Sequence, residues 1–170
     1  GKEIIEQLTG KNIELMYIFN THGHADHIAA NDDIKLATGA PVLIHGDDAH
    51  MLITAQGNLS SYIGSQLICQ AADRLLNDGD KFTVGEIEFQ VIHTPGHTPG
   101  GICLKADHVL FSGDTLFEQS VGRSDFPGGS HSQLVNSIKN KLLVLADNTT
   151  VFPGHGGSTT IGDERRANPF

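Results

Sequence analysis

The sequence predicts an α/β fold, and three observations lead to this prediction. Segments with helical spacing and strand-like apolar segments alternate along the first third of the chain. Two pairs of short apolar segments follow, each pair separated by turn residues as in antiparallel hairpins. Side chains that bind metals come directly after several strands, and loops at strand ends are where sites collect in α/β proteins. We therefore expect a single domain over residues 1–170 with its chemistry at the strand ends.

In the first part of the chain, helices and strands alternate. The predicted helix over 32–38 ends at Gly39, and a glycine at this position is typical of a helix C-terminus. A polar stretch with weak periodicity, residues 56–72, is predicted to be a loop. The expected elements are a helix over 4–8, a strand over 15–19, a helix over 32–38, a buried strand over 42–45 and a short helix over 47–52.

The second part predicts antiparallel strands and one long helix. Gly85 separates strands 81–84 and 86–92, and Ala106-Asp107 separates strands 101–105 and 109–112. A short strand over 150–152 follows later. Residues 130–145 should form an amphipathic helix that covers one face of the sheet, with Ser130 as its N-cap. Its apolar positions recur at helical intervals: Leu134, Val135, Ile138, Leu142 and Leu145.

Composition limits the classes of function. The chain has 170 residues, 38% of them hydrophobic, and a formal net charge of −9 without any basic run, which opposes nucleic acid as a substrate. No segment is long and apolar enough to span a membrane. Cys69 and Cys103 lack CxxC spacing and are expected to be buried thiols rather than a disulfide, so we expect a cytoplasmic protein.

The segment 21–27, Thr-His-Gly-His-Ala-Asp-His, holds three imidazoles and one carboxylate. His22 and His24 are two residues apart, and an extended backbone would place both side chains on the same face, where they can share one ion. Asp26 and His27 lie where a helix is expected to start, so their side chains diverge by about 100° around its axis. They are better placed for a second ion beside the first.

Three further metal-binding side chains come at strand exits. His97 lies in a loop rich in glycine and proline, residues 93–100, that can aim one imidazole. Asp114 follows the strand that ends near Phe111, and His155 follows the strand over 150–152. Imidazole and carboxylate groups bind Zn, Fe and Mn.

Together these motifs resemble the metallo-β-lactamase superfamily and, within it, short single-domain bacterial glyoxalase II-like hydrolases. The ordered set is His-x-His-x-Asp-His, Gly-His-Thr-x-Gly, Gly-Asp-Thr-Leu-Phe and Pro-Gly-His-Gly. The resemblance implies an αββα sandwich, here without its N-terminal strands. It assigns one metal to His22, His24 and His97, the other to Asp26, His27 and His155, and makes Asp114 a bridge between the two.

The implied chemistry is hydrolysis of a hydroxyacylglutathione-like thioester, or of a related small ester, by a hydroxide that bridges two divalent ions. Asp26 and Asp114 are the predicted catalytic carboxylates. Zinc is the preferred ion, with iron or manganese also compatible. Antibiotic-hydrolysing β-lactamases that carry a cysteine at the position of Asp114 differ from this chain.

Two other functions stay open. A related branch, the persulfide dioxygenases, also carries Gly-Arg-x-Asp-Phe and an Asn-Pro ending, and it would use one iron on His22, His97 and Asp114. His155 favours the binuclear hydrolase over that alternative. The other alternative is a truncated chain that binds metal without catalysis, because only 21 residues precede His22. An open sheet edge would then give either a homodimer or poor stability.

The substrate is expected to be a small-molecule thioester or ester. Full glyoxalase II enzymes have a further helical domain with basic residues for glutathione, which this chain does not match. Arg123 could pair with a carboxylate of the substrate, or form an internal ion pair with Asp125 that shapes its loop. Neither membrane nor nucleic acid is an expected partner.

Overall fold

The computed structural model describes all 170 residues. The chain divides into two compact units, Gly1–Leu75 and Leu76–Phe170, and each is described by itself. None of its helices has the length and apolar character needed to cross a membrane.

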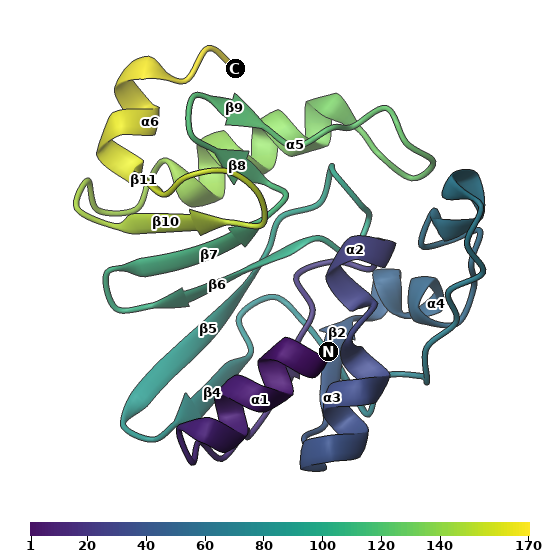
Figure 1. Ribbon diagram of the computed structural model, residues 1–170. Helices are drawn as coiled ribbons and strands as arrows, with labels where there is room; N and C mark the ends of the chain where they lie inside the picture. The colour runs from purple at the N-terminus through teal and green to yellow at the C-terminus, as the bar shows by residue number, and fades with distance from the viewer. The chain divides into compact units, whose positions relative to one another are not determined.

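The first unit contains a small sheet and short helices (Figure 1). Its sheet has the order β1-β2-β3, and β1 pairs in parallel with β2 so that Ile18 lies opposite Val42. The elements in chain order are α1 (Lys2–Gly10), β1 (Ile18–Phe19), α2 (Ala25–Ile28), α3 (Asn31–Thr38), β2 (Val42–His45), a 3-10 helix (Gly46–Asp48), α4 (Ala49–Leu52), a second 3-10 helix (Ser60–Ile63) and β3 (Arg74–Leu76).

A small apolar core holds this unit together. All four residues of β2 are buried. Val42 and Ile44 pack with Ile28 of α2 and Leu52 of α4, and Leu43 and His45 lie on the opposite face of the strand. The core also contains the thiol of Cys69, which is buried and forms no disulfide, as predicted.

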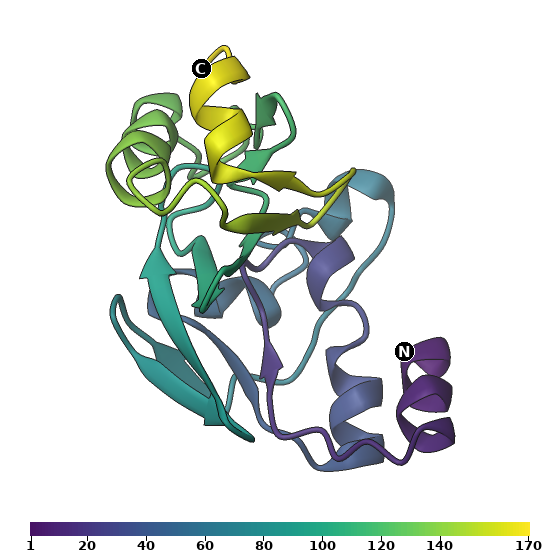
Figure 2. The same ribbon diagram turned by 90° about the vertical axis from the view of Figure 1, so that its left-hand side faces the viewer.

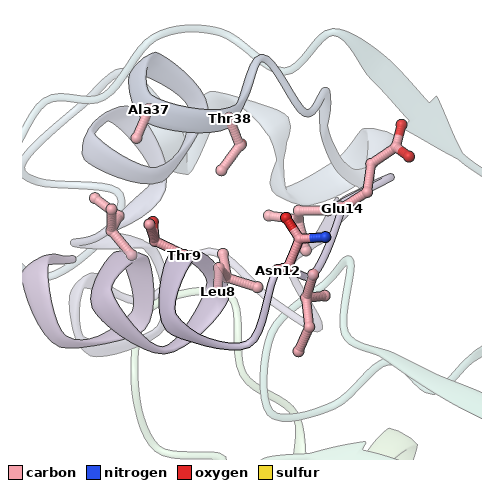
Figure 3. A pocket seen from close by; sticks show the side chains of 9 residues that line it. Leu8, Thr9, Asn12, Glu14, Ala37 and Thr38 are labelled. Carbon is pink, nitrogen blue, oxygen red and sulfur yellow. The ribbon is translucent and has the colours of Figure 1, made fainter.

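Helix α1 lies beside α3 (Figure 2). A pocket of about 470 Å³ opens between them (Figure 3). Leu8 and Thr9 of α1 and Ala37 and Thr38 of α3 line it, and its only ionisable lining side chain is Glu14. A pocket with one carboxylate and no other titratable group offers little for catalysis.

The second unit is built on a six-stranded sheet with the order β11-β10-β7-β6-β5-β4 (Figure 1). Strands β4 to β7 are joined as antiparallel neighbours, and β10 pairs in parallel with β7. The elements are β4 (Lys81–Val84), β5 (Ile87–His93), β6 (Ile102–Ala106), β7 (Val109–Gly113), β8 (Leu116–Phe117), β9 (Ser120–Val121), α5 (His131–Ser137), a π-helix (Ile138–Leu142), β10 (Thr150–Pro153), β11 (Thr159–Thr160) and α6 (Ile161–Ala167).

Helix α5 and the π-helix after it supply most of the apolar cover of this sheet. Leu134, Ile138 and Leu142 are buried against a cluster of strand and helix residues, and each fully buried leucine contributes roughly 1.5–3 kcal/mol relative to an exposed one. The other buried members of the cluster are Cys103, Leu110, Leu116, Val151 and Ile161.

Most predicted elements are present. The strand over 42–45 has the predicted bounds, Gly39 ends α3 in the left-handed conformation, and the Ser130 side chain accepts a hydrogen bond from the N–H of Gln133 as an N-cap. The helix over 130–145 differs from the prediction, because the i to i+5 pattern of the π-helix begins at Ile138 and the helix ends at Leu142. The hairpin β8-β9 and helix α6 were not predicted, since their strands and apolar positions are too few to give a periodic signal.

Candidate metal centre

The first group of candidate ligands, here called the N-terminal cluster, lies between β1 and the end of α2 and consists of His22, His24, Asp26 and His27. The His22 ring centroid is 4.8 Å from that of His24 and 4.0 Å from that of His27. The Nε2 atom of His27 lies 3.5 Å from Oδ2 of Asp26. Three imidazoles and a carboxylate are therefore gathered within the first unit, as the sequence predicted.

The local backbone explains how this cluster forms. His24 has extended φ and ψ of −69° and 151° and is the N-cap residue of α2, so the chain changes from extended to helical between the two pairs of ligands. His22 and His24 are buried, whereas the Asp26 side chain is 58% exposed. The helix predicted at Asp26 and His27 is present and His24 is extended, whereas the assignment of the two pairs to separate ions stays a prediction.

A buried aspartate holds the backbone between His22 and His24. The N–H of Gly23 donates a hydrogen bond of 3.2 Å to Oδ2 of Asp48, a residue with no exposed surface. A Cβ atom at Gly23 would lie only 2.5 Å from Cβ of Met51. The backbone between the two histidines thus fits closely against the end of the 3-10 helix and the start of α4.

The second group, here called the C-terminal cluster, consists of His97, Asp114 and His155. They follow β5, β7 and β10, respectively. Because β5 and β7 are each antiparallel to β6 and β10 is parallel to β7, all three strands run in the same direction and end at the same edge of the sheet. Three loops from distant parts of the sequence therefore place their side chains together within the second unit.

Asp114 lies between the two histidines of this cluster. Its Oδ2 atom is 3.7 Å from Nε2 of His97 and also 3.7 Å from Nε2 of His155. These distances are longer than a hydrogen bond. Two ligand atoms on one tetrahedral ion, with metal–ligand bonds of about 2.0–2.2 Å, are about 3.3–3.6 Å apart. The spacing therefore fits a carboxylate that shares ions with both imidazoles.

The loop of His97 packs closely against the start of α5. Gly96 has φ of +139°, and a Cβ atom there would lie 2.2 Å from the backbone nitrogen of Leu134, so only glycine fits. His97 is 5% exposed, and its Nδ1 lies 2.6 Å from the carbonyl oxygen of Arg123. The carbonyl can only accept, so Nδ1 carries the proton and Nε2 is left as the nitrogen that can bind an ion.

A family model of the metallo-beta-lactamase superfamily matches residues 2–155, which include both clusters. The chain belongs to the metallo-beta-lactamase superfamily. A family of metal-dependent hydrolases agrees with the donor set, since imidazole and carboxylate are the ligands of divalent zinc, iron and manganese.

Two curated superfamily members are similar over the whole chain. The hydroxyacylglutathione hydrolase GloC of Haemophilus influenzae is 34% identical over 174 residues, which cover 100% of this chain and 82% of that protein. The probable metallo-hydrolase YqgX of Bacillus subtilis is 34% identical over 173 residues and is covered to the same extents. These relatives show that the chain is a member of the metallo-hydrolase superfamily, and they support its resemblance to glyoxalase II-like proteins.

Solved structures give the same fold. BLEG-1 B3 metallo-beta-lactamase is 41% identical with a TM-score of 0.95, over 99% of this chain and 83% of that one. TTHA1623 in a di-iron-bound form is 35% identical with a TM-score of 0.89, over 99% and 84%. ETHE1 from Myxococcus xanthus is 32% identical with a TM-score of 0.82, over 99% and 68%. The predicted metallo-β-lactamase fold class is confirmed.

Arg123, the predicted substrate contact, makes a bidentate ion pair within its own loop. Its Nε and Nη2 donate to the two carboxylate oxygens of Asp125 at 3.0 and 2.9 Å. This pair raises the pKa of Arg123 and lowers that of Asp125. The internal ion pair that the sequence offered as an alternative is therefore present, and a role of Arg123 in substrate binding stays a prediction.

Sequence reasoning did not find the residues that hold the ligands. Asp48 acts on the backbone of Gly23 across 25 residues of sequence and belongs to no recognisable motif. His93 gave a signal, since it precedes the His97 loop, and its Nε2 lies 2.9 Å from the carbonyl oxygen of Pro99. This contact between the strand-end histidine and the backbone ties β5 to the far end of the loop.

Proposed function

We propose that this superfamily member is a binuclear metal-dependent hydrolase of a hydroxyacylglutathione-like thioester or a related small ester. The observation that carries the proposal is the position of Asp114, whose Oδ2 is 3.7 Å from the Nε2 atoms of both His97 and His155. A carboxylate between two imidazoles suits a ligand shared by two ions. The 34% identity to GloC supports the thioester as substrate.

In this proposal the two clusters together supply seven ligands, with Asp26 and Asp114 as the catalytic carboxylates. The ions would provide a hydroxide at neutral pH and positive charge for the oxygen that becomes negative during hydrolysis. His22, His24 and His97 would hold one ion, Asp26, His27 and His155 the other, and Asp114 both. The hydrogen bond from Nδ1 of His97 to Arg123 would fix which nitrogen faces an ion.

Zinc is the ion we propose first, because imidazole and carboxylate suit it well. Iron and manganese accept the same ligands, and the di-iron form of TTHA1623 supports iron as the main competitor. None of the seven proposed ligands is a cysteine, whose thiolate would favour zinc.

A mononuclear dioxygenase is the second candidate. The similarity to ETHE1 from Myxococcus xanthus favours it, and a two-histidine, one-carboxylate set is typical of iron oxygenases. The position of His155 beside Asp114 favours the hydrolase, because that histidine has no role in a site made of His22, His97 and Asp114 alone.

Metal content per chain tests these functions first. We would purify the protein without added metal and measure zinc, iron and manganese by inductively coupled plasma mass spectrometry. About two ions per chain, the number that a binuclear hydrolase uses, supports the proposal. One iron per chain supports the dioxygenase, and absence of metal supports a chain that does not catalyse.

Turnover then tests the substrate. Thiol release from S-lactoylglutathione and from a series of simpler thioesters would be followed with the metal-loaded protein, the chelator-treated protein and the protein after metal is restored. A small-molecule ester and a chromogenic cephalosporin belong in the same panel, because BLEG-1 is a B3 metallo-beta-lactamase. Cleavage of the cephalosporin alone would overturn the thioester proposal.

We also propose that β1, which is an edge strand of the first unit's sheet, can pair with a second copy of the chain. The formation of a homodimer would leave no unpaired edge there. Light scattering coupled to size exclusion measures this directly. A monomer that melts in one cooperative calorimetric transition would contradict it.

A further inference from the structure

The loop over residues 122–130, here called the positioning loop, connects β9 to α5. Its first residue, Gly122, donates its N–H to the carbonyl of Thr115 at 3.3 Å, directly after Asp114. Its last residue, Ser130, donates its N–H to the carbonyl of Gly96 at 2.8 Å, directly before His97. Both ends of the loop are therefore tied to backbone next to a proposed metal ligand.

The start of the loop also touches both ligands. A Cβ atom at Gly122 would lie 1.7 Å from the carbonyl oxygen of Asp114 and 3.4 Å from Cγ of His97. A Cβ atom never comes that close to an oxygen, so the backbone of Gly122 lies closer to Asp114 than any other residue type allows. This approach places the next carbonyl, that of Arg123, within 2.6 Å of Nδ1 of His97.

The side chain of Arg123 restrains that carbonyl. Its guanidinium forms the bidentate pair with Asp125 and lies over the ring of Phe126, with 4.2 Å from Cζ to the ring centroid. The carbonyl of Phe126 in turn accepts the N–H of Gly129 at 2.8 Å. An exposed ion pair adds little to global stability. Here it closes a turn of a few residues, so its effect is on the local conformation of the loop.

We propose that Arg123 and Asp125 are positioning residues: their ion pair holds the Arg123 carbonyl against His97 and so keeps its imidazole in the tautomer that directs Nε2 toward the metal site. This inference rests on the proposed function for the role of His97 as a ligand. It differs from the prediction that Arg123 binds substrate, because the group that acts on His97 is the backbone carbonyl of Arg123 and its side chain acts only through that carbonyl.

Asp125→Asn is the variant that tests the proposal, because it preserves shape but removes the charge that engages the guanidinium. Asp163→Asn is the matched control. Asp163 forms an Arg–Asp pair with Arg166 at 2.7 Å, and both pairs are about two-thirds exposed on their side chains. The control therefore loses a surface Arg–Asp pair of similar exposure that does not touch the positioning loop, at a carboxylate that also accepts a hydrogen bond from Thr160.

The first readout is the tautomer of His97 in the full-length, metal-free chain. Long-range nitrogen–proton NMR spectra show which ring nitrogen carries the proton. A His97→Gln variant assigns the signal. We expect the Nδ1–H form in the parent and the control, and a mixture of both tautomers in Asp125→Asn. An unchanged Nδ1–H form in Asp125→Asn overturns the proposal.

The second readout is the rate at which a chelator removes zinc from the loaded protein, and it decides the question if the metal-free chain does not stay folded. Loss of an outer hydrogen-bond partner of a ligand weakens metal binding by about 10–100-fold, so loss of its support should accelerate removal by about three- to tenfold. Equal rates in parent, Asp125→Asn and Asp163→Asn contradict the proposal. If the parent binds no zinc but the tautomer of His97 still changes in Asp125→Asn, the result contradicts the proposed function and leaves the positioning role intact.

Discussion

Asp114 and His155 follow two neighbouring parallel strands, and Oδ2 of the aspartate lies 3.7 Å from Nε2 of the histidine. The strands β7 and β10 are about 40 residues apart in the chain, yet their register, with Gly113 opposite Pro153, brings their ends together. The two side chains differ in exposure, 12% for Asp114 and 57% for His155. The aspartate is thus the more buried of the two proposed ligands.

Removal of these two ligands should have different effects on metal content. Asp114→Ala removes the proposed shared ligand and should lower the occupancy of both ions together. His155→Ala should lower the occupancy of the ion proposed to bind Asp26 and His27. It should spare the ion proposed to bind His22, His24 and His97, because His155 is not a proposed ligand of that ion. Mass spectrometric metal analysis after dialysis measures both. His108→Ala, at an exposed histidine of the same unit, is the control and should keep both ions.

Equal loss of both metals in the His155 and Asp114 variants would contradict the ligand assignment. Retention of both metals in Asp114→Ala would contradict the bridging role of that carboxylate.

Gly122→Ala should destabilise the protein. The added Cβ atom would lie 1.7 Å from the Asp114 carbonyl oxygen, which belongs to the backbone and cannot rotate away. Overpacking of this kind typically costs about 1–3 kcal/mol in the free energy of unfolding. Denaturant unfolding, followed by circular dichroism, measures the change.

Gly46→Ala is the control for this substitution, because a Cβ atom there would meet nothing within 4 Å. Its free energy of unfolding should stay within about 0.5 kcal/mol of the parent. A Gly122→Ala protein as stable as this control would show that the loop does not approach Asp114 closely.

Acid should weaken the salt bridge between Asp78, in the turn between β3 and β4, and Lys141 of the π-helix. Burial raises the pKa of Asp78, but hydrogen bonds from the His93 N–H and from Lys141, at 2.7 and 3.0 Å, more than offset this and lower it overall. A carboxyl with a lowered pKa stabilises the fold above its unfolded pKa and loses that contribution as the pH falls through the folded value. Asp78→Asn should therefore show a smaller loss of stability than the parent below about pH 4.

Thermal unfolding of both proteins between neutral and acid pH measures this difference. Parallel stability curves for the parent and Asp78→Asn down to the lowest pH would contradict the role assigned to the carboxylate.

The local signals in the sequence were enough for much of the fold and for both ligand clusters. The helix at Asp26 and His27 and the extended backbone at His24 were expected from the segment itself, and Ser130 follows from N-cap chemistry. The support for these ligands could not be predicted, because it depends on segments far apart in sequence. Asp48 reaches Gly23 across 25 residues, and the Arg123 carbonyl reaches His97 across 26.

The π-helix after α5 was missed for a different reason. An apolar pattern at helical spacing specifies which face is buried but does not distinguish i to i+4 from i to i+5 hydrogen bonds over a single turn. The Ile138 and Leu142 side chains are buried as the pattern predicts, although the backbone between them is wider than an α-helix.

Cys103 should resist modification in the folded protein and contribute to stability in a pH-dependent way. Burial is the main cause that raises the pKa of its thiol to about 11, and Thr94 hydrogen-bonds to the sulfur at 3.4 Å. Because the folded pKa is raised, the neutral thiol stabilises the fold below the unfolded pKa, and this contribution is lost as the pH rises toward about 11. A thiol reagent at pH 8 should therefore find Cys103 unreactive, whereas both cysteines should react in denaturant.

Cys103→Ala should be less stable than the parent at neutral pH, because the substitution leaves a cavity, and the difference in stability should shrink between about pH 9 and 11. Rapid native labelling of Cys103, identified by mass spectrometry, would show that this part of the core is open to solvent.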